Sequence, residues 1–419
     1  MNYKTLLLSL ALFGSVSCDK TKPEKLAPSK DLILTAVEQQ KANKDNQFAF
    51  LLFRTATAGL TAHENALLSP LSVGMALAMT NNGAAAETRE AIEKTLMFDG
   101  FTTEDINNYY KKLLTDLAIL DPKTTLDIAN SIWYRQDFKV LPSFIEVNQA
   151  FYNAVVSPLN FTDPDAPKAI NEWVSNNTRK KIPSIVDGPI PADMVMYLIN
   201  AVYFKGEWEQ RFDKSATKKG TFLRPGTDPL QTDFMHVHHT FNVAATSTTE
   251  AIELPYGQKK YSMVIMKPRK GVSTSQLIEQ LSDANSWQTL VSAFHPTETI
   301  LALPKLKFSY ENKLNDELTA LGMGIAFSDQ ADFSGIRENG GLAISEVKHK
   351  SFIEINEEGT EAAAVTSVGI VPTSAGPTYT FTADQPFLFA IREMNTGLIL
   401  FIGQVNDPSV TETKAQRRP

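Results

Sequence analysis

The sequence predicts a mixed α+β fold built as one large domain. Apolar residues recur at helical spacing through much of the first half of the chain, whereas strand-like apolar runs dominate the second half. No internal repeat and no linker divides the chain after position 31 of its 419 residues. A hydrophobic content of 43% and a net charge of −7 argue against a disordered chain and against a nonspecific nucleic-acid partner.

The helices are predicted from apolar residues three and four positions apart. Ser69-Pro70 strengthens one of them, because a capping hydroxyl followed by proline is typical of a helix N-terminus. The predicted helices are 34–58, 71–79, 88–96 and 169–179.

The strands are predicted from runs of apolar and β-branched residues bounded by turn residues. Asn395-Thr396-Gly397 is a hairpin turn signal, and Gly257 marks another turn. The predicted strands are 126–134, 194–204, 300–308 and 343–355, with hairpins at 251–266 and 391–405. Residues 409–419 are expected to form a polar tail without a pattern.

Residues 1–17 have the composition of an export signal. Lys4 supplies the positive charge, residues 6–13 form a short apolar core, and Ser15 and Ser17 are the small residues that a signal peptidase requires. The segment predicts export of the mature chain.

The only cysteine of the chain, Cys18, lies at the cleavage position. The segment therefore resembles a bacterial lipoprotein signal, which implies lipidation of Cys18 and a tether over residues 18–31. Plain secretion after Ser17 is the alternative, with Ser15 standing where a lipoprotein signal usually has leucine. In either case no thiol remains for a disulfide within the body of the chain.

A long polar and small-residue segment, 357–378, separates two strand-like runs. A loop of this length inside a domain is usually functional or disordered. In an extended chain its alternate residues share one face, and Glu361 lies on the opposite face. The shared face consists of small or β-branched side chains that a packed sheet can accept: Thr360, Ala362, Ala364, Thr366 and Val368.

This segment and four others together resemble the serpin family over residues 32–408. The first is Glu354–Ala364, which resembles the serpin hinge. The others are Leu68–Ser72, Asn130–Trp133, Leu198–Trp208, and the closing pair Pro386–Phe389 and Phe401–Pro408. With the N-terminal signal, the chain is similar to a surface serpin of a Gram-negative bacterium.

The resemblance implies the serpin fold, with a large central β-sheet, further sheets, about eight to nine helices and an exposed reactive-centre loop at about 357–380. It also implies covalent inhibition of a protease by insertion of the cleaved loop into the sheet, for which serpins are an established example. Gly359 supplies the bend, and no proline lies between Gly359 and Pro372, as insertion of the hinge requires. The implied hinge is Glu357, Glu358, Gly359, Thr360, Glu361, Ala362, Ala363, Ala364 and Val365.

Two further groups match serpin positions that hold the sheet closed. One cluster, expected under the parted strands, is Ser69, Ser72, Asn200 and His349. The other, expected at the top of the sheet with a Lys–Glu pair, is Trp208, Lys305 and Glu357.

The cleaved bond has two candidate positions. Counting from the hinge by the family spacing places it at Thr373-Ser374, whereas counting back from Pro386 places it after Ala375. We favour Thr373, because insertion length is measured from the hinge. The loop contains no Lys or Arg, so it suits elastase-like and subtilisin-like proteases with small apolar pockets, and papain-like enzymes are a further class. The expected complex is covalent and 1:1 with a monomeric inhibitor.

Other functions find less support. The chain has neither a Gly-x-Ser-x-Gly nor a His-Glu-x-x-His motif, which argues against common hydrolases. His236, His238 and His239 lack a paired carboxylate or thiolate cluster, so we interpret them as strand histidines and expect no metal or other cofactor. Residues 179–181 are interpreted as a solvated helix end, not a polyanion site. A non-inhibitory serpin-fold binding protein, whose loop is only a substrate, remains the alternative function.

Overall fold

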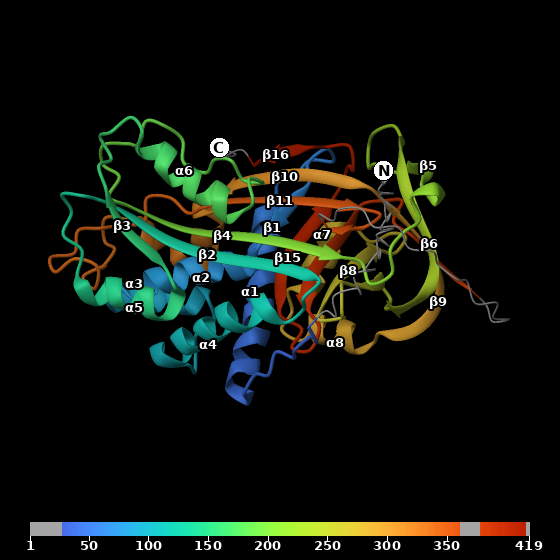
Figure 1. Ribbon diagram of the computed structural model, residues 1–419, viewed down its shortest axis with the longest axis horizontal. Coiled ribbons are helices and arrows are strands. Elements are labelled where there is room, and N and C mark those ends of the chain that lie inside the picture. The colour runs from blue at the N-terminus through green and yellow to red at the C-terminus, as the bar shows by residue number, and fades with distance from the viewer. Residues whose placement is uncertain (1–26, 361–377, 416–419) are drawn as a thin grey trace, which may run out of the picture.

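The structure, a computed structural model, describes residues 27–360 and 378–415. Within these residues, nine α-helices and two large β-sheets form the body, so the predicted α+β class is confirmed (Figure 1). The helices are α1 (Ala36–Thr57), α2 (Pro70–Asn81), α3 (Ala86–Thr95), α4 (Thr103–Asp116), α5 (Pro142–Tyr152), α6 (Ala166–Asn177), α7 (Thr274–Leu281), α8 (Ser286–Ser292) and α9 (Asn315–Leu318).

The central sheet has seven strands in the order β16-β10-β11-β12-β4-β2-β3. Its pairs are antiparallel except β10 with β16 and β2 with β3. The strands are β16 (Glu412–Lys414), β10 (Leu306–Lys313), β11 (Lys348–Asn356), β12 (Gly359–Thr360), β4 (Met196–Glu207), β2 (Thr124–Arg135) and β3 (Val155–Leu159).

The second sheet has nine strands in the order β1-β15-β14-β8-β7-β6-β9-β13, with β5 paired to β6. Its strands are β1 (Ala66–Leu68), β5 (Lys218–Phe222), β6 (Leu230–Ala245), β7 (Thr249–Pro255), β8 (Tyr261–Pro268), β9 (His295–Pro304), β13 (Tyr379–Thr382), β14 (Phe387–Glu393) and β15 (Ile399–Val405).

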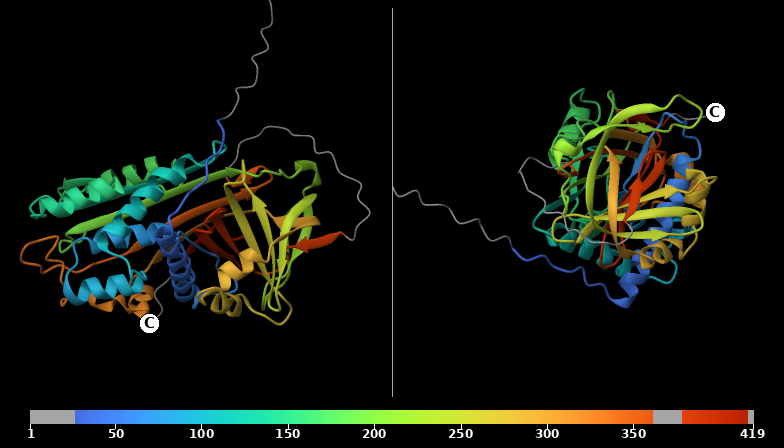
Figure 2. Two further views of the ribbon diagram at one scale, coloured as in Figure 1. Left: turned by 90° about the horizontal axis from the view of Figure 1, so that it is seen from below. Right: turned by 90° about the vertical axis from the view of Figure 1, so that its right-hand side faces the viewer.

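The hydrophobic core joins the two sheets. On β4, the Phe204 ring packs edge-on against Tyr256 and Tyr261, with ring centroids 5.2 and 5.8 Å apart. Helix α2 packs on the same face of the central sheet, whereas α6 lies across the opposite face (Figure 2). Side chains of β4 and β11 therefore alternate between a core face toward α2 and an outer face toward α6.

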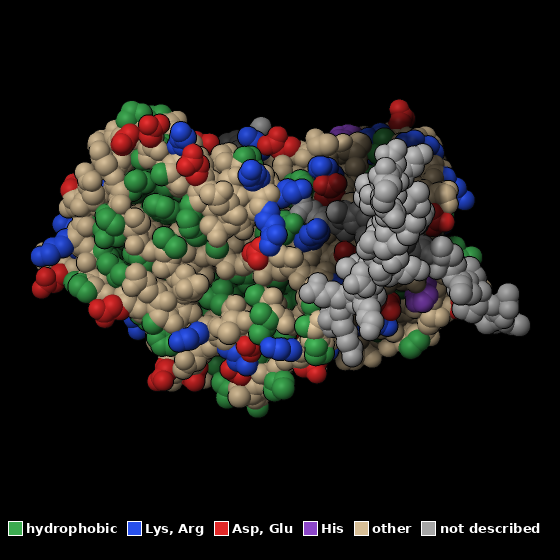
Figure 3. Space-filling view, viewed as in Figure 1, with side chains coloured by type: hydrophobic (Ala, Val, Ile, Leu, Met, Phe, Trp, Pro, Cys, Tyr) green, Lys and Arg blue, Asp and Glu red, His purple; other side chains and the backbone are tan. Residues whose placement is uncertain are grey.

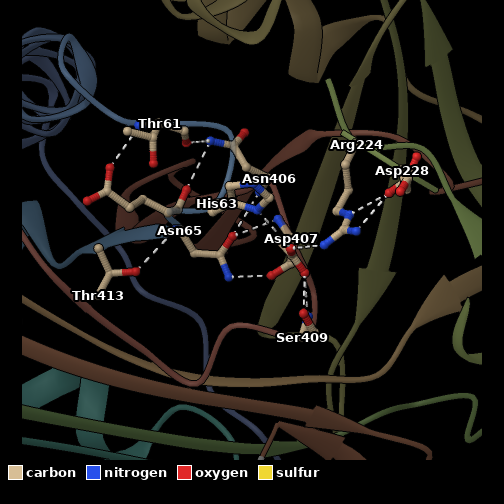
Figure 4. A network of polar contacts seen from close by, with 10 residues as sticks. Thr61, His63, Asn65, Arg224, Asp228, Asn406, Asp407, Ser409 and Thr413 are labelled. Carbon is tan, nitrogen blue, oxygen red and sulfur yellow. Dashed lines mark hydrogen bonds and ion pairs between the residues drawn. The ribbon is translucent and has the colours of Figure 1, made fainter. Parts of the chain in front are cut away.

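A polar clasp, seen in Figure 4, fastens the end of β15 to two distant loops. The Asn65 side chain accepts hydrogen bonds from the backbone N–H groups of Asn406 and Asp407 at 2.8 and 3.0 Å. Arg224, in the turn between β5 and β6, lies 2.7 Å from the Asp407 carboxylate. Burial raises the pKa of this carboxyl, but the Ser409 and Arg224 hydrogen bonds outweigh burial, so its pKa is lowered. The closing motif at 401–408 therefore holds the chain end in place.

Two predicted strands and the predicted tail were wrong in part. The segment 300–308 is not one strand, because the chain passes from the second sheet to the central sheet at Lys305, whose N–H bonds to Asp233. Residues 343–347 are not a strand, because Val347 N bonds to the Asn315 side chain and Ile344 N to Ala326. The supposed patternless tail contains β16, which pairs with β10.

Candidate functional site

The short strand β12 lies between β11 and β4 at one end of the central sheet. Thr360 pairs with Ile355 on β11 and with Gly206 on β4. A Cβ on Gly359 would lie 2.0 Å from the Gly206 carbonyl oxygen, so only glycine permits this close approach. The hinge segment therefore begins as a strand already set between β11 and β4.

An aromatic stack supports β12 from the core side. The rings of Trp208 and Tyr256 are parallel, with centroids 4.5 Å apart. Trp208 donates its ring N–H to the Asn356 carbonyl at 2.9 Å, and the Tyr256 hydroxyl lies 2.7 Å from the Thr360 hydroxyl. The sequence singled out Trp208 but missed Tyr256, whose partner Thr360 is 104 residues away in sequence.

The buried Glu357 carboxylate is the charged centre of this end of the sheet. Lys305 Nζ lies 3.0 Å from Glu357 Oε1, and the Thr217 hydroxyl donates to the same oxygen at 2.8 Å. Burial raises the pKa of Glu357, but its hydrogen bonds and the Lys305 charge outweigh burial, so the pKa is lowered. The structure thus brings together Trp208, Lys305 and Glu357 as the sequence predicts, and adds Thr217.

A second ion pair stands beside the first. Lys214 Nζ lies 2.5 Å from Glu358 Oε1, and the Glu358 side chain is buried. Sequence reasoning missed Lys214, because a lysine in a 3-10 helix of three residues carries no distinguishing pattern. Together the two pairs fix the backbone that leads into β12.

Beyond β12, the facing edges of β4 and β11 have no ladder partner between them within the described residues. Residues 196–205 of β4 pair only with β2, and residues 348–354 of β11 pair only with β10. We call the space between these two edges the slot; β4 and β11 run along its sides (Figure 1). Its edges present backbone groups of the kind that another strand satisfies.

A polar cluster lies beneath the slot. Ser69 caps α2 and donates its backbone N–H to His349 Nε2 at 3.3 Å. The Ser72 hydroxyl donates to Asn200 Oδ1, and Asn200 Nδ2 donates to Asn130 Oδ1 at 2.6 Å. The structure therefore brings together all four residues predicted for this cluster. It adds Asn130, which lies directly opposite Asn200 on the neighbouring strand β2. The alternation of side chains along β2, which places Asn130 on the core-facing side, was the signal that could have identified it.

The imidazole of His349 is neutral in the fold. Its burial lowers the pKa to about 4, although a hydrogen bond to the Leu67 backbone acts in the opposite direction. A neutral ring accepts the Ser69 hydrogen bond with Nε2, which a protonated ring is unable to do. His349 therefore links β11 to the start of α2 only while it is unprotonated.

Several predicted residues lie outside the described part of the chain: the reactive bond (Thr373, Ser374 and the alternative Ala375), the hinge residues Glu361, Ala362, Ala363, Ala364 and Val365, and Cys18. Among the space-filling side chains of Figure 3, grey marks the residues that are not described. His236, His238 and His239 lie on β6, with His238 Nε2 3.2 Å from Glu298 Oε1. The described residues contain no group of three side chains suited to a metal ion. They also contain no helix with the length and hydropathy that a membrane crossing requires.

Comparison with protein families matches residues 43–408 to the family described as Serpin (serine protease inhibitor). The leukocyte elastase inhibitor of Sus scrofa is 34% identical over 381 residues, covering 88% of this chain and all of that protein. Iripin-5 of Ixodes ricinus is also 34% identical, covering 88% of this chain and 95% of its own length. These matches span nearly the whole body.

Solved structures give the same result. Native tengpin, described as a thermophilic serpin, is 34% identical and superimposes with a TM-score of 0.82 over 91% of this chain and 97% of its own. Human thyroxine-binding globulin is 26% identical, with a TM-score of 0.80 over 89% of this chain and all of its own. The fold of this chain is thus the one that these solved structures share. The protein belongs to the serpin family, and is by class a protease inhibitor and not an enzyme.

Protonation of His349 is expected to destabilise the intact protein in acid. The pKa of its side chain is about 4 in the fold, against 6.5 for a free histidine side chain, so the unfolded chain binds more protons between these values. Stability is therefore lost as pH falls from about 6.5 to 4, by about 3 kcal/mol at one pKa unit per 1.4 kcal/mol. Urea unfolding of wild type and His349→Gln, at pH 7 and pH 4.5, measures this loss. The glutamine variant should lose less on acidification; an identical pH dependence in both proteins would contradict the assignment.

Replacing Glu357 with lysine is expected to loosen β12. The change places a second ammonium group beside Lys305 in a buried site, so β12 is no longer held and the edges of the slot become available to another molecule. We expect polymers, or a conformer that has lost inhibition, after mild heating, measured by size-exclusion chromatography. The control is Glu354→Lys, since Glu354 pairs with Lys307 on the outer face of the sheet. Equal polymer formation by both variants would show that Glu357 has no special role.

Proposed function

We propose that the protein is an inhibitory serpin that traps extracellular endopeptidases by loop cleavage and insertion into the slot. One observation carries the proposal: the hinge already starts a strand between β11 and β4, and the edges beyond it are unpaired within the described residues. Cleavage frees the residues that follow Thr360 to continue this strand. The ladder of β12 then sets the register of everything that follows.

Continuing that register places each core-facing loop residue opposite a defined pair. Ala362 would lie between Phe204 and Ile353, where only a small side chain avoids the aromatic ring. Thr366 would lie between Asn200 and His349, and its hydroxyl suits the polar cluster there. Val368 and then Ile370 would follow over the apolar side chains of Leu198 and Met196. At these four positions the alternation would suit the side chains along the slot, which supports the proposal.

Insertion is expected to release a large free energy. About a dozen residues would each gain ladder hydrogen bonds worth roughly 1 kcal/mol net, which amounts to on the order of ten kcal/mol. Burial of Val368 and Ile370 adds about 1.5–3 kcal/mol for each side chain. The uncleaved fold is therefore metastable with respect to the inserted form.

The trapping step follows from ordinary serine-protease chemistry. The protease hydroxyl attacks the carbonyl of Thr373, the peptide bond to Ser374 breaks, its nitrogen takes up a proton, and an ester joins Thr373 to the protease. At about 3.3 Å per residue, insertion of residues 361–373 carries this ester over roughly 40 Å. Misplacement of catalytic groups by about 1 Å can cost about 100-fold in rate. Hydrolysis of the ester is therefore arrested and the complex persists.

The expected targets have small or apolar primary pockets. Val371, Thr373 and Ala375 offer such side chains, and the loop has no cation for a trypsin-like pocket. Elastase-like and subtilisin-like proteases suit this loop, and papain-like proteases form a further class. Likeness to leukocyte elastase inhibitors supports the first group.

We also propose that the chain acts outside the cell, attached through a lipid on Cys18 and the tether that follows it. Plain secretion is the alternative address. The working unit is a monomer that forms a 1:1 complex, since one slot accepts one loop.

A binding protein with a passive loop is the second candidate function. Likeness to thyroxine-binding globulin favours it, because that protein shares the fold at 26% identity and is described by what it binds. The small side chains on the core-facing side of the hinge favour inhibition over this alternative.

Incubation with a pancreatic-type elastase is expected to give a complex that survives SDS. The released fragment should begin at Ser374, as measured by N-terminal sequencing or mass spectrometry. A fragment that begins after Ala375 would move the reactive bond by two residues. Complete digestion without complex would contradict inhibition and favour the passive loop.

A charge on the core-facing side of the hinge is expected to stop insertion. Ala362→Arg would force a guanidinium between Phe204 and Ile353, so the ester would hydrolyse first and the stoichiometry of inhibition should rise at least tenfold. Glu361→Arg is the matched control, because residue 361 would face outward between Lys205 and Glu354. The control should inhibit within about twofold of wild type. Equal loss of inhibition in both variants would contradict the register.

A further inference from the structure

A cavity of about 230 Å³ lies under the slot, on the side of α2. Its walls come from three places: α2, the N-terminal half of β4, and the segment 341–347 that precedes β11. Ala76 is the α2 residue that is open to the cavity, because it is half-buried whereas all other residues of α2 are buried. The cavity is thus formed by a helix, a strand and the segment before β11 together, and not by a single loop.

The middle of the lining is apolar, and both ends are polar. Met196 and Leu198 of β4 are half-buried and line it, and Leu342, Ile344 and Val347 line it from the facing segment. This apolar part of the lining favours an aliphatic or otherwise apolar group in the occupant, because burial of apolar surface drives binding to such sites.

One end of the cavity is polar but uncharged. Asn200, further along β4 than Leu198 and Met196, lines this end with Ser72 and His349. The amide of Asn200 accepts from Ser72 and donates to Asn130, and each of its two atoms has capacity for a further hydrogen bond. A hydroxyl group, which both donates and accepts, matches this amide.

The other end carries charged side chains at the rim. Asp193 is exposed there, and Glu346 and Lys348 are half-buried beside it. Lys348 lies 2.6 Å from Asp187, so its charge is already paired. The rim therefore offers no unpaired cation to an anionic headgroup.

We propose that this cavity binds a neutral medium-chain aliphatic alcohol or a compound of the same chemistry. Its chain would lie along Met196 and Leu198, and its hydroxyl would bond to the Asn200 amide. At roughly 30 Å³ for each water-sized group, the cavity holds about eight such groups, which sets the length near eight carbons. A carboxylate of the same length would leave its charge without a partner beside a neutral imidazole and would bind more weakly.

The consequence for regulation rests on the proposed function. Continuation of the β12 register places Val368 and Ile370 over this same cavity, so the ligand and the inserting loop would compete for it. A bound alcohol would slow insertion and let more cleaved molecules escape the covalent complex. The site would then act as a switch between inhibitor and substrate.

The test uses octan-1-ol as the probe and the intact full-length protein. Methionine methyl NMR reports binding, because Met196 lines the cavity whereas Met263 and Met266 lie in the second sheet. We expect saturable shifts of the Met196 signal, assigned with Met196→Leu, and no shift of the other two. Octanoate should need at least tenfold higher concentration. Absence of a saturable Met196 shift, or equal binding of octanoate, would overturn the proposal.

Ala76→Phe provides the matched variant, since its ring would fill the cavity from α2. It should abolish the response of Met196 to octan-1-ol, and an unchanged response would overturn the location. In the elastase assay, octan-1-ol should at least double the share of inhibitor cleaved without complex for wild type but not for Ala76→Phe; an unchanged share would overturn the competition. If no complex forms even without octan-1-ol, the proposed function is wrong. The NMR measurement still tests, independently of inhibition, whether the cavity binds the alcohol.

Discussion

Strands β4 and β11 lie in one sheet but do not pair with each other within the described residues, and the other features of the site follow from this missing pairing. Backbone N–H and C=O groups need hydrogen-bond partners. Where two long strand edges face each other without pairing, the groups along both edges lack the partner strand that would satisfy them. Only β12, two residues long, fills the space between them within the described residues. The features of the site serve either to hold this arrangement or to complete it.

The contacts that keep β4 and β11 in this arrangement fall into two sets, one beside β12 and one further along the slot. At the top, the Glu357–Lys305 pair and the Trp208–Tyr256 stack fix the entry of β12. Beneath the slot, neutral His349 and the Ser72–Asn200 contact join the strands to α2. Both sets include polar contacts inside an apolar body, so each is specific in geometry and sensitive to a single change of charge.

The sequence predicted the class of fold and most residues of both sets, but not all of their partners. Alternation from Thr360 onward predicts a core-facing side of the hinge, and of these residues the structure describes Thr360, whose hydroxyl lies beside that of the buried Tyr256. Tyr256, Thr217 and Lys214 were missed, because each is a common residue type whose role depends on a partner more than 100 residues away. The strand predicted at 300–308 shows the same limit: an apolar run does not reveal that the chain changes sheets at Lys305. The tail strand β16 was missed because three residues form no recognisable period.

The proposed mechanism requires a body that becomes more stable when its loop is cut. The most direct test is the melting temperature of the intact protein and of the protein nicked in the loop by a subtilisin-like protease, followed by circular dichroism at equal concentration. Insertion worth on the order of ten kcal/mol predicts that the nicked form melts roughly 20 °C or more above the intact form. An equal or lower melting temperature of the nicked form would show that no strand enters the slot, and would contradict inhibition by loop insertion.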